Sequence, residues 1–461
     1  MGIRTVEAGW TNAYRGAMTE TVSLPRNPIA KVVAASLIGT TIEWYDFFLY
    51  GSAAALVFDK LFFPTSSALT GTLLAFATYA IGFAARPLGG LVFGHFGDRL
   101  GRKKLLVLSL VLMGCATFAM GLLPGYASVG VAAPLLLTGL RLVQGFALGG
   151  EWSGSVLIVS EQGDDRRRGF WASWPQVGAP GGNLLATAVL AVLAATQSDA
   201  TFLSWGWRIP FLLSGVLVLI GLWIRVQLTE TPAFVAAATA AKATGQPERR
   251  PIVTVLRDQW RQVLVAMGAR MGENLSYYVV TSFILVYVVD ELKLPKSTAL
   301  DAVLIGSAVE LAAIPLWALL SDKIGRRPVY LFGAIGMAAW IFAFFALLDT
   351  KSTGAIDLAA IVALVLHGAM YGPQAAFFSE LFGTRVRYSG TSIGYQLASI
   401  IAGGLAPLIA TALLAGFGSA TPVALYVAAG AAITVLALAV AKETRGRSLT
   451  KADTEPAAVR V

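Results

Sequence analysis

Twelve apolar runs, each long enough to cross a lipid bilayer as a helix, account for most of this 461-residue chain. A helix needs roughly 20 mainly apolar residues to span the hydrocarbon layer. Charged residues make up only 13% of the sequence, whereas soluble domains have roughly 25%. Because so little charge is available to coat a water-exposed surface, lipid must cover most of the exterior. The runs lie at 31–58, 68–94, 104–123, 132–159, 168–195, 207–228, 261–289, 298–320, 328–348, 356–380, 389–415 and 420–441.

A polar stretch near the middle of the chain divides these runs into two groups of six. We therefore expect an all-α membrane protein with twelve transmembrane helices in two six-helix repeats. No apolar run precedes residue 29, so no cleavable signal peptide is expected. The expected units are a cytoplasmic N-terminal tail (1–28), an N-terminal six-helix bundle (29–228), a cytoplasmic linker (229–260), a C-terminal six-helix bundle (261–441) and a cytoplasmic C-terminal tail (442–461).

Positive charge is concentrated in alternate loops between the runs. The formal net charge is +9, and basic clusters occur at 99–104, 166–168, 323–327, 385–387 and 442–447. Lys and Arg are enriched in the cytoplasmic loops of membrane proteins. We therefore expect both termini of this multi-pass protein to be cytoplasmic; the family resemblance described below implies the bacterial inner membrane. These basic loop residues account for the positive net charge, so we do not expect nucleic acid to be a partner.

Few residues are available for metal or nucleophile chemistry. The chain has one cysteine, Cys115, and two histidines, His95 and His367. No intrachain disulfide can form, and a metal cluster built from Cys or His is not expected. A membrane-embedded enzyme would require a nucleophile–base pair or a metal cluster. We therefore expect neither enzymatic activity nor a cofactor or metal.

A short charged motif occurs twice, about half a chain apart. GHFGDRLGRKK at 94–104 recurs as ALLSDKIGRR at 318–327, each time after the second run of its half. Two parallel repeats are typical of one class of secondary transporter. Aspartate in this position can accept hydrogen bonds from a helix N-terminus, so we expect the motif to hold the halves together as a gate on the cytoplasmic side. Arg86 and Glu161 are candidates for the same network. The gating residues are Asp98, Arg99, Arg102, Asp322 and Arg326.

The first copy of this motif resembles the loop motif G-x-x-x-D-R-x-G-R-[RK] of the major facilitator superfamily. Further segments resemble its metabolite:proton symporter family, which includes permeases for citrate, α-ketoglutarate, proline/betaine and shikimate. The segments that resemble this family are EWYDFFLYG at 43–51, RPLGG at 86–90, RLVQG at 141–145, GGE at 149–151 and WGWRIPF at 205–211. Within the family, the shikimate permeases are the most similar in appearance.

The resemblance extends from about residue 28 to residue 447. It implies a proton-coupled symporter that moves a small organic acid, shikimate-like or another carboxylate, by alternating access. The partners would then be the organic anion, protons and membrane lipid, and a monomer suffices for this fold. A facilitator-type exporter or antiporter of small metabolites remains the alternative, because the direction of transport cannot be read from sequence.

Two carboxylates, Glu43 and Asp46, lie near the middle of the first run. Their spacing places them on one face of a helix, with Tyr50 about one turn further along. An ionisable side chain costs about 2.5–3.5 kcal/mol at the centre of a membrane helix, which favours a functional role. Two close carboxylates resist being charged together, so one is expected to hold a proton near neutral pH, as proton coupling requires. Structural pairing with Arg141 and direct contact with the substrate are the alternatives.

The fourth run carries Arg141, Gln144 and Glu151. Gln144 and Glu151 are seven residues apart and share a helix face. A guanidinium group matches the two oxygens of a carboxylate, so Arg141 is a candidate for binding the substrate anion. Glu151 is a third candidate for proton coupling. The alternative for Arg141 is a fixed ion pair with Asp46 or Glu43.

Other polar residues interrupt later runs. In the seventh run, Arg270 and Glu273 either bind solutes or neutralise each other. Glu310 is either a second protonation site or a partner of Arg270, and His367 is either a structural residue or a ligand-binding one. The candidate substrate-binding residues are Arg141, Gln144, Tyr50, Gln176, Asn274, Tyr277, Tyr371, Gln374 and Gln396.

Overall fold

The computed structural model describes residues 28–100, 102–226, 251–382, 387–447 and 449. Side chains are described for these residues except at 94–100, 102, 103, 106, 225 and 251–254. Nearly all of the predicted N-terminal tail and most of the predicted linker therefore lie outside the described residues.

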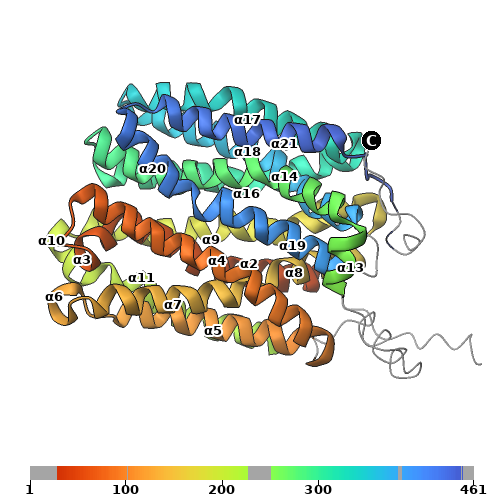
Figure 1. Cartoon of the computed structure of the whole chain (residues 1–461), viewed down its shortest axis with the longest axis horizontal. Coiled ribbons are helices and arrows are strands. Elements are labelled where there is room, and N and C mark those ends of the chain that lie inside the picture. Colours follow the sequence, from red (N-terminus) through yellow and green to blue (C-terminus); the bar gives the residue numbers. More distant parts are fainter. Residues whose placement is uncertain (1–27, 101, 227–250, 383–386, 448, 450–461) are drawn as a thin grey trace, which may run out of the picture.

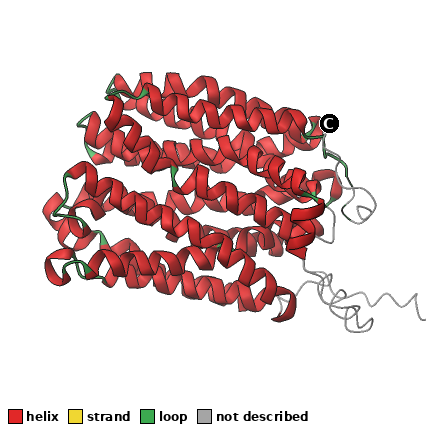
Figure 2. Cartoon of the chain, in the orientation of Figure 1, coloured by secondary structure: helices red, strands yellow, loops and turns green. Residues whose placement is uncertain are grey.

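Long helices run side by side along one axis of the molecule (Figure 1), and Figure 2 shows helices joined by loops throughout the described part of the chain. The elements of the first half are α2 (Ile29–Ala53), η1 (Ala54–Phe58), α3 (Asp59–Phe62), α4 (Ala68–Leu100), α5 (Arg102–Leu122), α6 (Tyr126–Val129), α7 (Ala132–Leu148), α8 (Glu151–Gln162), η2 (Asp165–Arg167), α9 (Arg168–Thr196), α10 (Asp199–Thr201), η3 (Phe202–Gly206) and α11 (Arg208–Val226).

The second half lies above the first in the view of Figure 1. Its elements are α13 (Pro251–Asp258), α14 (Trp260–Tyr278), η4 (Val279–Phe283), α15 (Ile284–Val286), η5 (Tyr287–Glu291), α16 (Lys296–Ile324), α17 (Arg326–Asp349), α18 (Thr353–Leu381), α19 (Arg387–Ser399), η6 (Ile400–Gly404), α20 (Ala406–Phe417) and α21 (Thr421–Val440). The element η2 is a short 3-10 helix, whereas η1 and η3 to η6 are π-helical turns.

The predicted all-α membrane fold is confirmed. Within the described residues, ten helices or helix series are long and apolar enough to span a membrane. An eleventh span consists of Asp199–Gly206 and Arg208–Ile224, which are bent by 42° relative to each other. The remaining predicted run forms α5, whose apolar part, Val107–Leu122, is shorter. All twelve predicted runs are therefore helical.

Large apolar side chains cover the outer surface. Phe417 is 71% exposed, Trp223 68% and Leu135 67%. Soluble monomers rarely expose apolar patches of more than a few hundred Å². The exposed apolar side chains therefore fit a surface in contact with lipid.

The two halves meet along two seams. Helix α9 of the first half packs against α16 and α18, and α4 packs against α19, η6 and α20. The end of the bundle where Arg168, Arg326 and Arg387 lie is called the basic end below; the opposite end carries α3, α6 and α10 (Figure 1). Helix α2 begins at the basic end, because Val32 and Val33 pack against Val159 near the end of α8.

Glycines allow α4 and α7 to approach at backbone distance. A Cβ atom at Gly145 would lie 1.9 Å from the carbonyl oxygen of Gly82, and one at Gly149 would lie 2.0 Å from that of Arg86. Small residues at such positions are the usual means by which membrane helices pack closely. The RLVQG and GGE segments therefore position helix backbones, in addition to any role in the site.

The substitution Gly145→Ala is expected to lower the apparent melting temperature of the detergent-purified protein, since its methyl group would separate α4 from α7. Overpacking of this kind costs about 1–3 kcal/mol. The matched control is Gly139→Ala on the same helix, where a Cβ atom would have no described atom within 4 Å. That control should be neutral or slightly stabilising, and equal melting temperatures for the two variants would contradict the packing argument.

Candidate functional site

A small cavity lies between the two halves near the middle of the bundle. Its volume is about 10 Å³, which is about the space that one water molecule requires. An organic acid is much larger than this cavity, so binding there would need the halves to move apart. The lining residues are Thr40, Glu43, Trp44, Arg86, Leu148, Glu151, Trp152, Tyr395 and Gln396.

Aromatic rings from both halves close the centre on the side toward the opposite end. The Phe48 ring lies 5.3 Å from that of Tyr277, and the Phe83 ring lies 5.4 Å from that of Tyr278. These pairs join α2 and α4 of the first half to α14 of the second. These ring contacts lie between the cavity and the opposite end.

Two buried arginines, Arg86 and Arg141, lie over aromatic faces in the first half. The guanidinium carbon of Arg86 is 4.2 Å from the ring centre of Phe47 and 4.4 Å from that of Phe83. Arg141 lies 4.2 Å from the Phe47 ring and 4.3 Å from the Tyr50 ring. Such contacts stabilise a buried cation. In both arginines Nε and Nη2 have no hydrogen-bond partner among the described residues, so these donors can serve an anion.

Arg86 lines the central cavity, because α4 brings it beside Trp44 and Glu43 of α2. We named it as a candidate for the gating network of the loop motif. The side chains of the first copy of that motif lie outside the described residues, so this stays a prediction.

The predicted group around Asp46 forms a chain of contacts. Arg141 donates to Oε1 of Gln144, and Gln144 Nε2 donates to the backbone oxygen of Asp46 at 3.1 Å and to Oγ1 of Thr117 at 2.8 Å. Among the described residues, Oδ1 of Asp46 has no hydrogen-bond partner. Within the described residues, Arg141 forms no ion pair with a carboxylate. The alternative of a fixed pair with Asp46 or Glu43 is therefore not observed.

Glu151 begins α8, directly after the break that ends α7 at Leu148. Ser109 of α5 donates a hydrogen bond of 3.2 Å to Glu151 Oε2. Thr117, the partner of Gln144, also lies on α5. The prediction that Gln144 and Glu151 share a face is therefore confirmed, despite the break.

A second polar group lies in the other half. Arg270 of α14 pairs with Glu273 at 2.8 Å and lies 3.3 Å above the ring of Tyr395. His367 of α18 contacts Glu273 through Nε2 at 3.0 Å and Glu310 through Nδ1. Arg270 and Glu273 thus neutralise each other, as one alternative predicted. Glu310 contacts the histidine, which the sequence did not indicate.

The predicted substrate-binding residues fall into two sets. Four of them keep a buried polar atom without a partner among the described residues: Arg141 Nε and Nη2, Asn274 Nδ2, Tyr277 Oη and Gln396 Oε1. The others bond to protein groups: Tyr50 to Thr78 at 2.6 Å, Gln176 to Trp152 at 2.6 Å and to the Tyr371 backbone at 3.2 Å, and Gln374 to Glu273 at 3.0 Å. The ring of Tyr371 packs against that of His367.

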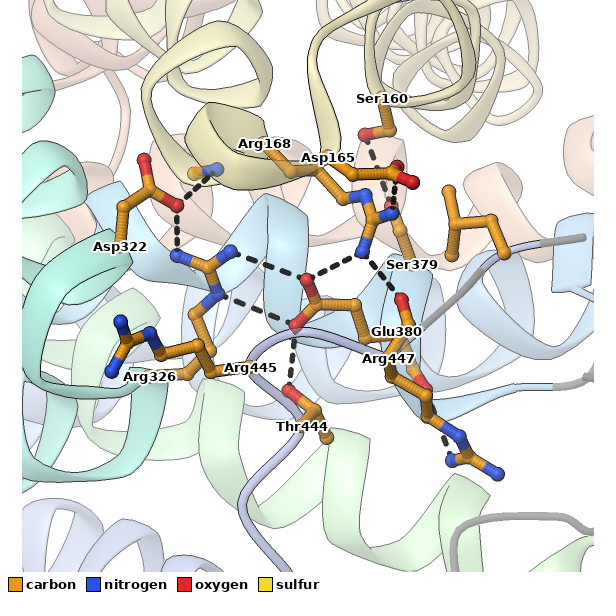
Figure 3. Close-up of polar contacts among 12 residues, drawn as sticks. Ser160, Asp165, Arg168, Asp322, Arg326, Ser379, Glu380, Thr444, Arg445 and Arg447 are labelled. Carbon is orange, nitrogen blue, oxygen red and sulfur yellow. Dashed lines mark hydrogen bonds and ion pairs between the residues drawn. The ribbon is translucent and has the colours of Figure 1, made fainter.

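At the basic end, the second copy of the loop motif binds the N-terminus of α9. Both oxygens of Asp322 accept from backbone N–H groups, Oδ1 from Gly169 at 2.8 Å and Oδ2 from Phe170 at 2.9 Å. Asp322 also pairs with Arg326 at 2.6 Å. The predicted link between the halves thus exists for this copy (Figure 3). The side chains of the first copy, Asp98, Arg99 and Arg102, lie outside the described residues.

Glu380 joins the same network from the end of α18. It accepts from Arg168 at 2.9 Å, from Arg326 at 3.2 Å and from Thr444 at 2.7 Å (Figure 3). Glu443 in the segment after α21 also accepts from the backbone N–H of Arg326 at 2.9 Å. Sequence reasoning missed Glu380 and this segment, since only packing brings them to the motif.

Known proteins match most of this chain. A profile of the sugar (and other) transporter family matches residues 31–455. The shikimate transporter of Escherichia coli K12 is 40% identical over 427 residues, covering 92% of this chain and 97% of that protein. The inner membrane metabolite transport protein YhjE of the same organism is 40% identical over 430 residues, with the same coverage. The proline/betaine transporter of Salmonella typhimurium LT2 is 33% identical over 429 residues, covering 91% and 85%.

Solved structures agree on the fold. The major facilitator superfamily proton:xylose symporter XylE bound to 6-bromo-6-deoxy-D-glucose superposes with a TM-score of 0.72 at 17% identity, covering 92% of this chain and 98% of that one. A D-xylose-proton symporter crystal structure gives a TM-score of 0.71 at 20% identity, covering 92% and 100%.

The fold and the buried polar centre define a multi-pass membrane transporter of the major facilitator type, not an enzyme. The chain belongs to the sugar (and other) transporter family.

The substitution Glu380→Gln is expected to open the basic end, because it leaves two buried arginines without their common counter-charge. Removing one partner of a buried ion pair costs about 3–5 kcal/mol. Opening can be measured as the maleimide labelling rate of Ser160→Cys in a Cys115→Ser background, since Ser160 is 1% exposed and faces Ser379 across the seam. We expect labelling to accelerate roughly tenfold or more.

The control for this experiment is Asp165→Asn. Asp165 pairs with the same Arg168, but its side chain is 72% exposed. An exposed pair contributes about 0–1 kcal/mol, so labelling should change little. Equal acceleration of labelling in both variants would show that Glu380 does not hold the basic end closed.

Proposed function

We propose that the protein is a proton-coupled symporter of a small organic acid, shikimate-like or another carboxylate, which works by alternating access. The observation that carries this proposal is the pair of buried arginines, Arg86 and Arg141, with unpartnered N–H donors beside buried carboxylates. In this proposal the protein acts as a monomer in the bacterial inner membrane, with both termini in the cytoplasm and lipid around it.

The unpartnered arginine donors favour an anionic substrate. A buried guanidinium group with unsatisfied donors is unfavourable, and a carboxylate can satisfy two donors at once. Arg86 lines the central cavity, and Asn274, Tyr277 and Gln396 offer further polar atoms on the side of the second half. The similarity to the shikimate transporter supports the same substrate class.

The carboxylates of the first half favour proton coupling. Glu43, Asp46 and Glu151 are each at most 2% exposed, whereas Arg86 and Arg141 are the buried cations that accompany them. Carboxylates this close together resist being charged at the same time. A proton on one of them relieves that repulsion, and a charge at this depth in the membrane is costly. The proton symport of the structurally similar XylE is in keeping with this role.

Alternating access requires each end to open in turn. The aromatic rings of Phe48 and Tyr277 block one path, and the Asp322 and Glu380 contacts at the basic end block the other. In our proposal the bundles 29–228 and 261–441 rock against each other along the α9–α16 and α4–α19 seams. The basic end then faces the cytoplasm.

The experiment that tests this function uses purified protein in liposomes with an acidic exterior and an alkaline lumen. Labelled shikimate is offered beside labelled citrate, α-ketoglutarate, benzoate and betaine. We expect one carboxylate to accumulate above its external concentration and a protonophore to abolish the gradient of solute. If the solute only reaches equal concentrations on both sides, with no effect of the pH gradient, symport would be rejected and the exporter or facilitator alternative favoured.

The substitution Asp46→Asn is expected to abolish accumulation against a gradient while leaving binding of the solute within about threefold of wild type. An amide keeps the shape of the side chain but cannot exchange a proton. The measurement compares pH-driven uptake with solute exchange at equal pH on both sides. Asp357→Asn on α18 provides the control, and undiminished uphill uptake by Asp46→Asn would reject the coupling role.

The substitution Arg141→Lys is expected to raise the KM for a carboxylate solute roughly tenfold or more, because a hydrogen bond to a charged group contributes about 1.5–3 kcal/mol. Lysine keeps the charge and loses the planar fork of donors. Initial rates of exchange give KM directly. Arg261→Lys, at an exposed position of α14, is the matched control, and an unchanged KM for Arg141→Lys would assign this arginine to structure alone.

A further inference from the structure

A histidine of the second half is held between two glutamates from two other helices. His367 lies on α18, Glu273 on α14 and Glu310 on α16. All three are at most 2% exposed. Nε2 of His367 lies 3.0 Å from Glu273, and Nδ1 contacts Glu310. These three side chains are called the triad below.

The geometry of the triad sets the number of protons it contains. A neutral imidazole has one N–H donor and one acceptor nitrogen, and an ionised carboxylate only accepts. Hydrogen bonds at both ring nitrogens therefore require two protons in total. Either both are on an imidazolium ring, or one is on the ring and the other is on a glutamate. Loss of one of them leaves a nitrogen lone pair facing a carboxylate.

The charge balance of the triad also favours the state with two protons in its hydrogen bonds. With two protons in its hydrogen bonds the triad has a net charge of −1, and Arg270, 2.8 Å from Glu273, supplies +1. Loss of one proton leaves an uncompensated negative charge in the membrane interior, which is costly. The triad is therefore built to bind one exchangeable proton.

Among the described residues that contact the triad, Arg270 is the compensating cation and the other ring contacts come from phenols. From α14 come Arg270 and the phenol of Tyr277, whose ring centre is 4.6 Å from that of His367. Helix α18 itself supplies Tyr371, α17 supplies Tyr330 through Gln374, and α19 supplies Tyr395 under Arg270. Oε2 of Glu310 and the Tyr277 hydroxyl have no hydrogen-bond partner among the described residues. Oε2 of Glu310 is therefore available to bind a proton.

The triad also lies beside the seam between the halves. Ser307, about one helical turn before Glu310, accepts a hydrogen bond of 3.1 Å from Asn183 of α9. The ring of Tyr277 contacts Phe48 of α2. A change of charge at Glu310 and His367 is thus adjacent to contacts that must break when the halves move.

We propose that Glu273, His367 and Glu310 form a second proton-binding site, which loads and releases one proton in each transport cycle in addition to any proton on the carboxylates of the first half. The proton arrives from the water on one side, completes the second hydrogen bond of His367, and leaves to the water on the other side. This inference rests on the proposed symport, but the binding of the proton can be tested without transport.

The test of binding is a potentiometric titration of purified protein between about pH 5 and about pH 9, where ordinary carboxylates stay ionised. We expect Glu310→Gln to bind one proton fewer than wild type over this range, because Arg270 and Glu273 alone are already balanced. The matched control is Asp301→Asn on the same helix, an exposed carboxylate that should not change the count. Equal counts for wild type and Glu310→Gln would overturn the inference, since His367 would then titrate independently.

The test of coupling uses labelled shikimate as the probe in proteoliposomes. Glu310→Gln is expected to reduce pH-driven accumulation at least tenfold while retaining exchange at equal pH, and His367→Gln should behave alike. Asp301→Asn should accumulate as wild type does. Full accumulation by both triad variants would overturn the second site and leave the proposed symport intact. If wild type accumulates neither shikimate nor another of the carboxylates offered above, the proposed function has failed, and the titration still decides whether the triad binds the proton.

Discussion

Every ionisable side chain in the centre of this bundle must find a counter-charge or a proton, because lipid and protein offer no bulk water to solvate it. The rest of the structure follows this requirement. In each half, buried carboxylates lie near buried arginines. The first half has Glu43, Asp46 and Glu151 near Arg86 and Arg141, and the second has Glu273 and Glu310 near Arg270. In the proton-coupled mechanism that we propose, a proton that binds among these carboxylates lowers the cost of holding them in the membrane interior.

The same requirement explains why the two ends differ. The basic end closes through ionic contacts, with Glu380 between Arg168 and Arg326. These groups can be rehydrated when that end opens, so the contacts can form and break at modest cost. Toward the opposite end the centre closes through aromatic rings such as Phe48 and Tyr277, which are held together by apolar contact and not by an ion pair. A closed centre with room for only about one water fits a conformation between these two openings.

Sequence reasoning predicted the parts of this arrangement that depend on local spacing. The twelve helices, the repeated loop motif and the Arg270–Glu273 pair all follow from apolar length or from helical periodicity. It could not predict which helices approach one another. The place of Arg86 at the cavity was therefore not anticipated. Nor was the contact of His367 with Glu310, since it joins residues 57 positions apart. The sequence signal for the triad was only that each member is ionisable within an apolar run.

The most direct test of the central claim is to record proton and solute movement together. Proteoliposomes containing a pH-sensitive dye would receive labelled shikimate on the outside, with no gradient imposed at the start. The account predicts that the lumen acidifies in step with the influx of label, at a fixed ratio of protons to solute. Influx of label with no change in lumenal pH would contradict it, because the buried carboxylates would then exchange no proton during transport.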